Sequence, residues 1–424
     1  MPHRSQSLRR FRFHRPQRIA AGLLALFLAQ GLWLAGSRSQ AAFGAAYARC
    51  GLQMWQNPAP RAMDATSCGR IRDGILAYRL AGLPLALVDL AGRVRDFAFR
   101  RDTPGLSTPS QQKTARPSGF FRSFCGTNRE GWMEALCGGA LRRTIFRLLP
   151  RLPFLAAGWV LGGCLWWVTR RLYGNLGGYT ALALYCFSPE VLRSGAAPDA
   201  DILAALALYR GVYTCIGVAH AMQGPRQRWR PRILLLTAAF SVAAAAHIVA
   251  LPVAALLGLA AMLWIAEGRR GEIVAVVLLA MAGAVAAVFA CYGFSLHATG
   301  WAFGSASSLV RFSLEPARRF FGSAANAGIT AAACAASALY LSVGRSRYFG
   351  NTTPLLCAAV CLGTIPAGDP AGAWLWAQPF LFTFAGGVLA DAYESRHGRW
   401  ALAAAAAMVA LQAAVCVAHL PGLP

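Results

Sequence analysis

Charged side chains, and acidic ones above all, are scarce in this sequence of 424 residues. Asp, Glu, Lys and Arg together make up 13% of the chain, which is about half of the roughly 25% found in soluble proteins. Hydrophobic residues make up 57%, and they gather in apolar stretches of about 20 residues, the length needed to cross a bilayer. This composition disfavours a soluble enzyme, a disordered chain, a coiled coil and a secreted disulfide miniprotein. It predicts an all-α, polytopic membrane protein.

Lysine is almost absent, since Lys113 is the only one, and the net charge of +25 therefore comes from arginine. A basic chain can bind nucleic acid through its phosphates. Here, however, the arginines form short clusters between apolar stretches, which is typical of the cytoplasmic loops of membrane proteins. We therefore expect membrane lipid, and no nucleic acid, as a partner.

The apolar stretches predict about eleven transmembrane helices. They lie near residues 19–36, 148–168, 174–188, 201–221, 233–247, 250–266, 273–295, 323–343, 353–366, 373–392 and 400–419. Arginine clusters then fall in alternate connections, at residues 170–171, 226–232, 269–270, 345–347 and 396–399. All of these connections share a side with the basic tail 1–18. The positive-inside rule therefore predicts a cytoplasmic N-terminus and integration into the cell (inner or plasma) membrane.

The longest apolar run, residues 233–266, has about 34 residues. At about 1.5 Å per residue it is too long for one helix across a hydrocarbon core of about 30 Å. His247 and Pro252 offer the point of reversal. The segment 308–321 mixes apolar and charged residues, and we expect it to lie flat on the outer surface.

A long polar segment, residues 37–147, separates the first predicted helix from the rest, and long loops cross the membrane largely regardless of their charge. Residues 75–92 are patchily apolar and predict an interfacial helix. The predicted organisation is a basic tail 1–18, a first helix 19–36, an outer loop 37–147 and a bundle of about ten helices at 148–424. The alternative for the first apolar run is a signal peptide cleaved near Ala41 and Ala42.

Four of the 12 cysteines fall in the predicted outer loop, namely Cys50, Cys68, Cys125 and Cys137. In an oxidising compartment they can form two disulfides in three possible pairings, and the alternative is that they are unpaired. The chain has no CxxC or Cys/His metal spacing, which disfavours a zinc site.

In the outer loop, Asp73 precedes a patchily apolar helix that contains Tyr78. A carboxylate at a helix start near the membrane surface can accept a proton from an incoming hydroxyl. The alternative is an acid that complements the helix dipole, or that pairs with Arg70 or Arg72.

A second acidic group lies in the connection 188–201, where Glu190, Asp199 and Asp201 surround Arg193. Asp199 and Asp201 can bind a divalent cation through their oxygens, or position a substrate hydroxyl. The alternative is an N-cap, since one acid before the apolar run 202–209 suffices for capping. A divalent cation at these two residues is the one cofactor that the sequence offers.

Arg210 lies within a predicted transmembrane helix, where a cation costs at least about 2.5 kcal/mol on insertion scales. It should therefore face a cavity or a partner, and its planar guanidinium suits either a lipid phosphate or an acid. His247 is a weaker candidate, since a histidine at such a position is more often part of the core.

The order of these features resembles the GT-C superfamily of integral-membrane glycosyltransferases, which includes protein O-mannosyltransferases and lipid A aminoarabinose transferases. Asp73, Tyr78 and Ala81 resemble the first-loop motif of that family, although Gly74 replaces its usual second acid and a downstream His-Pro-Pro type motif is missing. The segment from Ser188 and Pro189 to the two aspartates is similar to the family's link between its third and fourth spans.

This resemblance implies transfer of a sugar from a polyprenyl-phosphate donor to an acceptor at the outer face. Asp73 would be the catalytic base and Asp199 and Asp201 supporting acids, in a single displacement in which lipid phosphate leaves. The candidates for binding the substrate or its departing phosphate are Glu190, Tyr78, Arg72, Arg193 and Arg210. The alternatives are a transporter or flippase, which would carry acids near the midplane in two related halves, and a non-catalytic membrane subunit that packs through its small residues.

Overall fold

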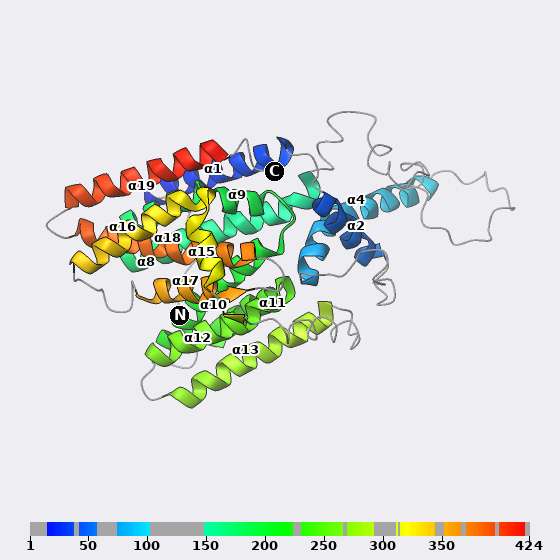
Figure 1. The fold of residues 1–424 in the computed structure, drawn as a ribbon. Coiled ribbons are helices and arrows are strands. Elements are labelled where there is room, and N and C mark those ends of the chain that lie inside the picture. Colours follow the sequence, from blue (N-terminus) through cyan, green and yellow to red (C-terminus); the bar gives the residue numbers. More distant parts are fainter. Residues whose placement is uncertain are drawn as a thin grey trace, which may run out of the picture.

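The computed structural model describes residues 15–37, 42–56, 74–101, 148–223, 230–265, 269–291, 311–312, 314–343, 352–365, 370–394 and 398–419. These residues form an all-α protein, in which the only strands described are two of two residues each (Figure 1). Five of the described helices are long and apolar enough to cross a membrane. The all-α class is thus confirmed, and the apolar helices indicate a membrane-embedded protein.

The elements follow one another along the chain as α1 (Arg15–Ser37), α2 (Ala42–Gln56), α4 (Ile75–Arg101), η2 (Leu149–Arg151), α8 (Leu152–Cys186), α9 (Pro189–Gly195), α10 (Ala200–Met222), α11 (Arg230–Ala246), α12 (Ala250–Ile265), α13 (Arg270–Cys291), β1 (Arg311–Phe312), α15 (Glu315–Gly322), η4 (Ala324–Asn326), α16 (Ala327–Val343), α17 (Thr352–Gly363), β2 (Thr364–Ile365), α18 (Pro370–Tyr393) and α19 (Gly398–His419). The two strands pair in antiparallel fashion.

Helix α8 is a hairpin of two arms rather than one straight rod. The backbone leaves the helical region at Gly174, whose φ of 80° favours glycine. The Tyr185 hydroxyl donates to the Gly158 carbonyl over 2.6 Å although the two residues are 27 positions apart, about 40 Å in a continuous helix. The chain therefore turns back at Gly174, which was predicted as the first residue of the helix 174–188, whereas the predicted connection 169–173 is helical.

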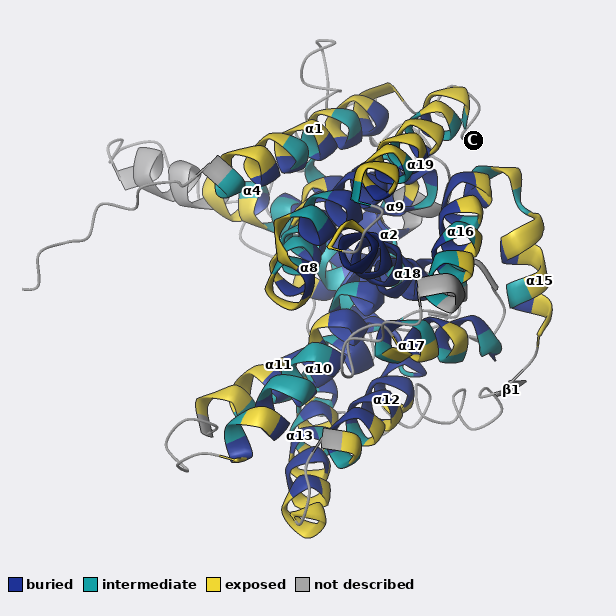
Figure 2. Ribbon diagram, turned by 90° about the vertical axis from the view of Figure 1, so that its left-hand side faces the viewer, coloured by how far each residue is buried: buried dark blue, intermediate teal, exposed yellow. Residues whose placement is uncertain are grey.

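Helix α18 is the centre of the bundle. All of its side chains from residue 375 to residue 392 are buried, and it contacts α8, α10, α16, α17 and α19 (Figure 2). Close packing against α8 depends on glycine, because a Cβ at Gly386 would lie 2.6 Å from the Gly177 carbonyl oxygen. Small residues that bring two backbones together are a common device of helix packing in membranes.

The long apolar run divides where the sequence predicts. Helix α11 ends at Ala246 and α12 begins at Ala250, with His247 in the break. Both helices pack along α10, since Gly211 faces Phe240 of α11 and Gly258 of α12 faces Cys215. The chain therefore runs toward the start of α10 and then returns, which confirms the predicted reversal.

Helices α2 and α4 pair beside one end of the bundle, at the right of Figure 1. They cross at two glycines, because a Cβ at Gly51 would lie 1.9 Å from the Tyr78 carbonyl oxygen and one at Gly82 would lie 2.1 Å from the Gly51 carbonyl carbon. The rings of Tyr47 and Tyr78 stack at 4.3 Å. The helix predicted at residues 75–92 is therefore present within α4, and α4 also contacts α10 and α11.

Two arginines meet at the last turns of α10. Arg232 donates to the Gly217 carbonyl, and Arg269 donates to the Met222 carbonyl over 2.5 Å. The Met222 carbonyl, at the end of α10, lacks a partner within the helix, and cationic side chains stabilise such helix C-termini. Two of the predicted basic clusters therefore lie at one end of the bundle, which we call the basic end.

Candidate functional site

The opposite end of the bundle, which we call the acidic end, carries Glu190, Asp199 and Asp201 near the start of α10. The chain passes the same end as it enters α4, because the Gly74 amide donates to the Ala246 carbonyl over 2.7 Å. A Cβ at Gly74 would lie 2.0 Å from the Ala245 carbonyl oxygen. This close approach excludes any larger residue at position 74.

Two of the predicted site residues, Asp73 and Arg72, lie outside the described residues. The covalent neighbour of Asp73 is Gly74, whose contact with the break between α11 and α12 is described above. The predicted base therefore remains a prediction, and the nearest described part of the chain is held at the acidic end.

Below this contact, His247 lies in the break itself and is 8% exposed. Its ring meets the indole of Trp376 on α18 edge to face, with 5.2 Å between the centroids. Gly74 thus contacts the break from the side of the loop, while the His247 side chain, which belongs to the break, contacts the core. This arrangement connects the start of α4 to the central helix through one turn of backbone.

Asp199 is the N-cap of α10. One carboxylate oxygen accepts from the Asp201 amide over 3.0 Å, and the other accepts from the Ser194 hydroxyl over 2.6 Å. Capping satisfies an amide that has no partner within the helix. The structure therefore contains the N-cap that the sequence offers as the alternative to a binding site. Asp201 is half-buried in the first turn.

Glu190 and Arg193 lie on the short helix α9, which packs against α1, α8 and α10. Glu190 is half-buried and Arg193 is exposed. Both belong to the acidic end, as their place in the sequence predicts. Within the described residues, no group of three or more His, Cys, Asp or Glu side chains could hold a metal ion.

Two further candidates lie away from this group. Tyr78 is buried, and its ring stacks on Tyr47, so it holds α2 against α4. Arg210 is exposed on α10, nine residues beyond Asp201, which is about 14 Å along the helix. The structure therefore brings Glu190, Arg193, Asp199 and Asp201 together but leaves Arg210 further along the span.

A buried polar network at the same end was not predicted. The Ser188 hydroxyl donates to the Gln378 side-chain oxygen over 2.8 Å, and the Gln378 amide donates to the Asn326 side-chain oxygen over 3.2 Å. The amide of Gln412 donates to the Phe187 carbonyl over 3.3 Å. The sequence carries a signal for this network, because glutamines inside apolar stretches such as those of α18 and α19 require partners across the bundle.

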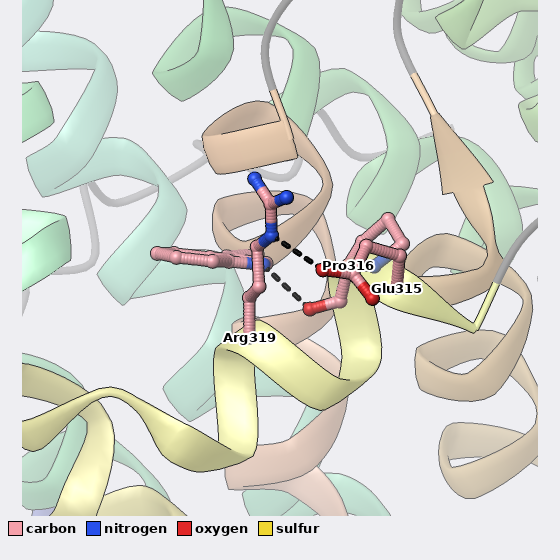
Figure 3. A network of polar contacts seen from close by, with 4 residues as sticks. Glu315, Pro316 and Arg319 are labelled. Carbon is pink, nitrogen blue, oxygen red and sulfur yellow. Dashed lines mark hydrogen bonds and ion pairs between the residues drawn. The ribbon is translucent and has the colours of Figure 1, made fainter.

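The segment predicted to lie flat on the outer surface forms a short amphipathic helix, α15. Pro316 and Phe320 are buried, whereas Arg319 is exposed. The Trp374 indole donates to the Pro316 carbonyl over 2.8 Å, and Arg319 pairs with Glu315 at the same distance (Figure 3). Helix α15 is therefore anchored to the start of α18.

Cys50, on α2, is disulfide-bonded, whereas the eight described cysteines from Cys164 onward are free. The predicted disulfide chemistry of the outer loop is thus present at Cys50. Cys68, Cys125 and Cys137 lie outside the described residues.

Comparisons of the chain with protein-family models, with curated proteins and with solved structures find no match. The fold and the site therefore define an all-helical, membrane-embedded protein with one acidic and one basic end.

Proposed function

We propose that this protein is a membrane glycosyltransferase that moves a sugar from a polyprenyl-phosphate donor to an acceptor at the outer face of the membrane. We further propose that the chain crosses the cell membrane eleven times, with its N-terminus in the cytoplasm and its acidic end outside. In this arrangement the basic end faces the cytoplasm, as the positive-inside rule requires.

The observation that carries the proposal is the hydrogen bond from Gly74 to Ala246. It ties the chain that immediately follows Asp73 to the end of the bundle that bears Asp199, Asp201 and Glu190. A catalytic base must be within hydrogen-bond reach of the proton that it removes, so an acid on the loop needs such an anchor. The anchor is backbone to backbone and requires glycine.

In the proposed reaction, Asp73 accepts the proton of the acceptor hydroxyl, and the hydroxyl oxygen attacks the anomeric carbon of the sugar. The bond from that carbon to the lipid phosphate breaks, and the phosphate leaves with its electron pair. General-base help of this kind is worth about 10²–10⁴-fold in rate.

The departing phosphate needs a cation, and position favours Arg193 over Arg210. Arg193 lies on α9 within the acidic end and is exposed, whereas Arg210 lies well inside the span. Arginine matches phosphate oxygens in a bidentate fashion. Arg72 is the other candidate for binding the phosphate, because it directly precedes Asp73 in the sequence.

The disulfide of Cys50 supports the outward placement of the acidic end. Structural disulfides persist in oxidising compartments and are rare in the cytosol. Cys50 lies on α2, which packs against α4, the helix that Gly74 precedes. If α2 faces an oxidising compartment, the acidic end therefore faces the same compartment.

The experiment is sugar transfer from a radiolabelled polyprenyl-phosphate sugar by the purified full chain in vesicles. Asp73→Asn should lower transfer by at least about 10²-fold while membrane insertion is unchanged, and Asp102→Asn, in the same loop, should retain transfer. Unchanged transfer in Asp73→Asn would remove Asp73 from the mechanism. Flux of the sugar lipid into sealed vesicles without a covalent product would instead identify a transporter.

The proposed orientation is tested separately. A cysteine or tag at residue 110 should react with a membrane-impermeant reagent in intact cells. Labelling that requires broken cells would overturn the topology, and with it the proposed site.

A further inference from the structure

Arg210 is an exposed cation on a helix whose other faces are buried. Its neighbours Tyr209 and Gly211 are buried, whereas Arg210 itself is exposed. In the described part of the chain, no carboxylate pairs with it, and the ion pairs found join other residues at helix ends. The Cys164 thiol on α8 lies within the electrostatic reach of Arg210.

The depth of Arg210 makes this exposure costly. It lies ten residues after Ala200 and twelve residues before Met222, so about 15 Å and 18 Å from the two ends of α10. If α10 crosses a hydrocarbon core of about 30 Å, Arg210 is near the midplane. Arginines near helix ends reach the interface by extending along the helix, but one at the midplane needs a polar partner within the membrane.

The face of α10 that carries Arg210 is only partly covered by the rest of the bundle. On α10, Leu206 and Gly217 share its face and are only partly buried. Small residues at such a surface allow the close approach of a second helix.

Among the residues that the structure describes, a second copy of this chain has no exposed acid at mid-span to offer. Among the described residues, the exposed carboxylates are Glu272, Glu315 and Glu394, and all three lie at or just beyond a helix end. None is at mid-span, where Arg210 needs its partner.

We propose that this face of α10 docks a transmembrane helix of a different protein, which carries a carboxylate near the middle of its span. The guanidinium and the carboxylate would form a charge-assisted, bidentate pair inside the membrane. Leu206 and Gly217 would contact the docked helix. The inference does not depend on the proposed transfer reaction.

The test uses the purified full chain in vesicles of zwitterionic phospholipid. A synthetic, fluorescently labelled transmembrane helix of Leu and Ala carries one central Glu, and its twin carries Gln at that position. Energy transfer to a dye on the chain measures association. The Glu helix should bind at least tenfold more tightly than the Gln helix, and Arg210→Gln should abolish this difference. Arg193→Gln, which removes a cation from α9, should preserve it.

Equal binding of the Glu and Gln helices to the unaltered chain would overturn the proposal. So would displacement of the Glu helix by a low fraction of phosphatidic acid in the vesicles, which would assign Arg210 to a lipid phosphate. A charge-reversal experiment controls for misfolding of the Arg210→Gln variant. Arg210→Glu should bind a helix with a central Lys in preference to one with a central Glu, and the opposite preference would contradict the inference.

Discussion

The contact between Gly74 and the break after α11 predicts that Gly74→Ala destabilises the acidic end. The added methyl group would lie 2.0 Å from the Ala245 carbonyl oxygen and 2.5 Å from that of Ala246. Both obstacles are backbone atoms, so no side-chain rotation relieves the clash. The chain must retreat, and the 2.7 Å hydrogen bond from Gly74 to Ala246 breaks.

The magnitude follows from two contributions. Loss of one intramolecular hydrogen bond costs about 0.5–1.5 kcal/mol, and forcing an extra methyl group into a packed contact costs about 1–3 kcal/mol. We therefore expect Gly74→Ala to lower the free energy of unfolding by about 2–4 kcal/mol. If Asp73 is the base, transfer should also fall by about 10²-fold, because a displacement of about 1 Å has that effect on a positioned group.

The assay is reversible unfolding of the purified chain by SDS in mixed micelles. Gly22→Ala is the matched control, since a Cβ at Gly22 has no atom within 4 Å, and it should leave stability unchanged or slightly higher. An unfolding free energy of Gly74→Ala equal to that of the unaltered chain would refute the reasoning. Lost stability with full transfer activity would retain the contact but separate it from catalysis.

Three further predictions use the same unfolding measurement. Gly82→Ala should cost about 1–3 kcal/mol, because its Cβ would meet the backbone of α2; a stability equal to that of Gly22→Ala would contradict the helix crossing. Ser188→Ala should cost about 1–3 kcal/mol by leaving the buried oxygen of Gln378 without its donor; a stability equal to that of Gly22→Ala would contradict this bond. Asp199→Ala should cost about 0.5–2 kcal/mol through the lost cap, whereas Asp199→Ser should restore it. Retained stability of Asp199→Ser with lost sugar transfer would show that this carboxylate binds substrate as well.

The features that the sequence predicted correctly are those that depend on local chemistry. The division of the first part of the bundle into two arms, which turn at Gly174, and the break at His247 follow from the length of the apolar runs and from the residues that interrupt them. The helix near residues 75–92 and the amphipathic helix α15 follow from patchy polarity.

The acidic connection was predicted as a group, but its chemistry was left open between a cap and a site. A cap and a ligand need the same carboxylate at the start of a helix, and only the distances from Asp199 to Ser194 and to the Asp201 amide identify the cap. The sequence likewise could not show that Gly74 makes a close contact with another part of the backbone. Whether a glycine is needed for close packing depends on the segment that it packs against, and here that segment is about 170 residues away in the chain.

Composition and charge alone determined that this chain is all-helical and membrane-embedded, because a bilayer rejects both unpaired backbone groups and charged side chains. The tertiary structure alone decided that α18 is central, that Ser188 bonds Gln378 and that Arg210 faces outward. The physical reason is that lipid is as apolar as a protein core. Hydrophobicity therefore marks which segments enter the membrane, but it does not distinguish a helix surrounded by protein from one surrounded by lipid.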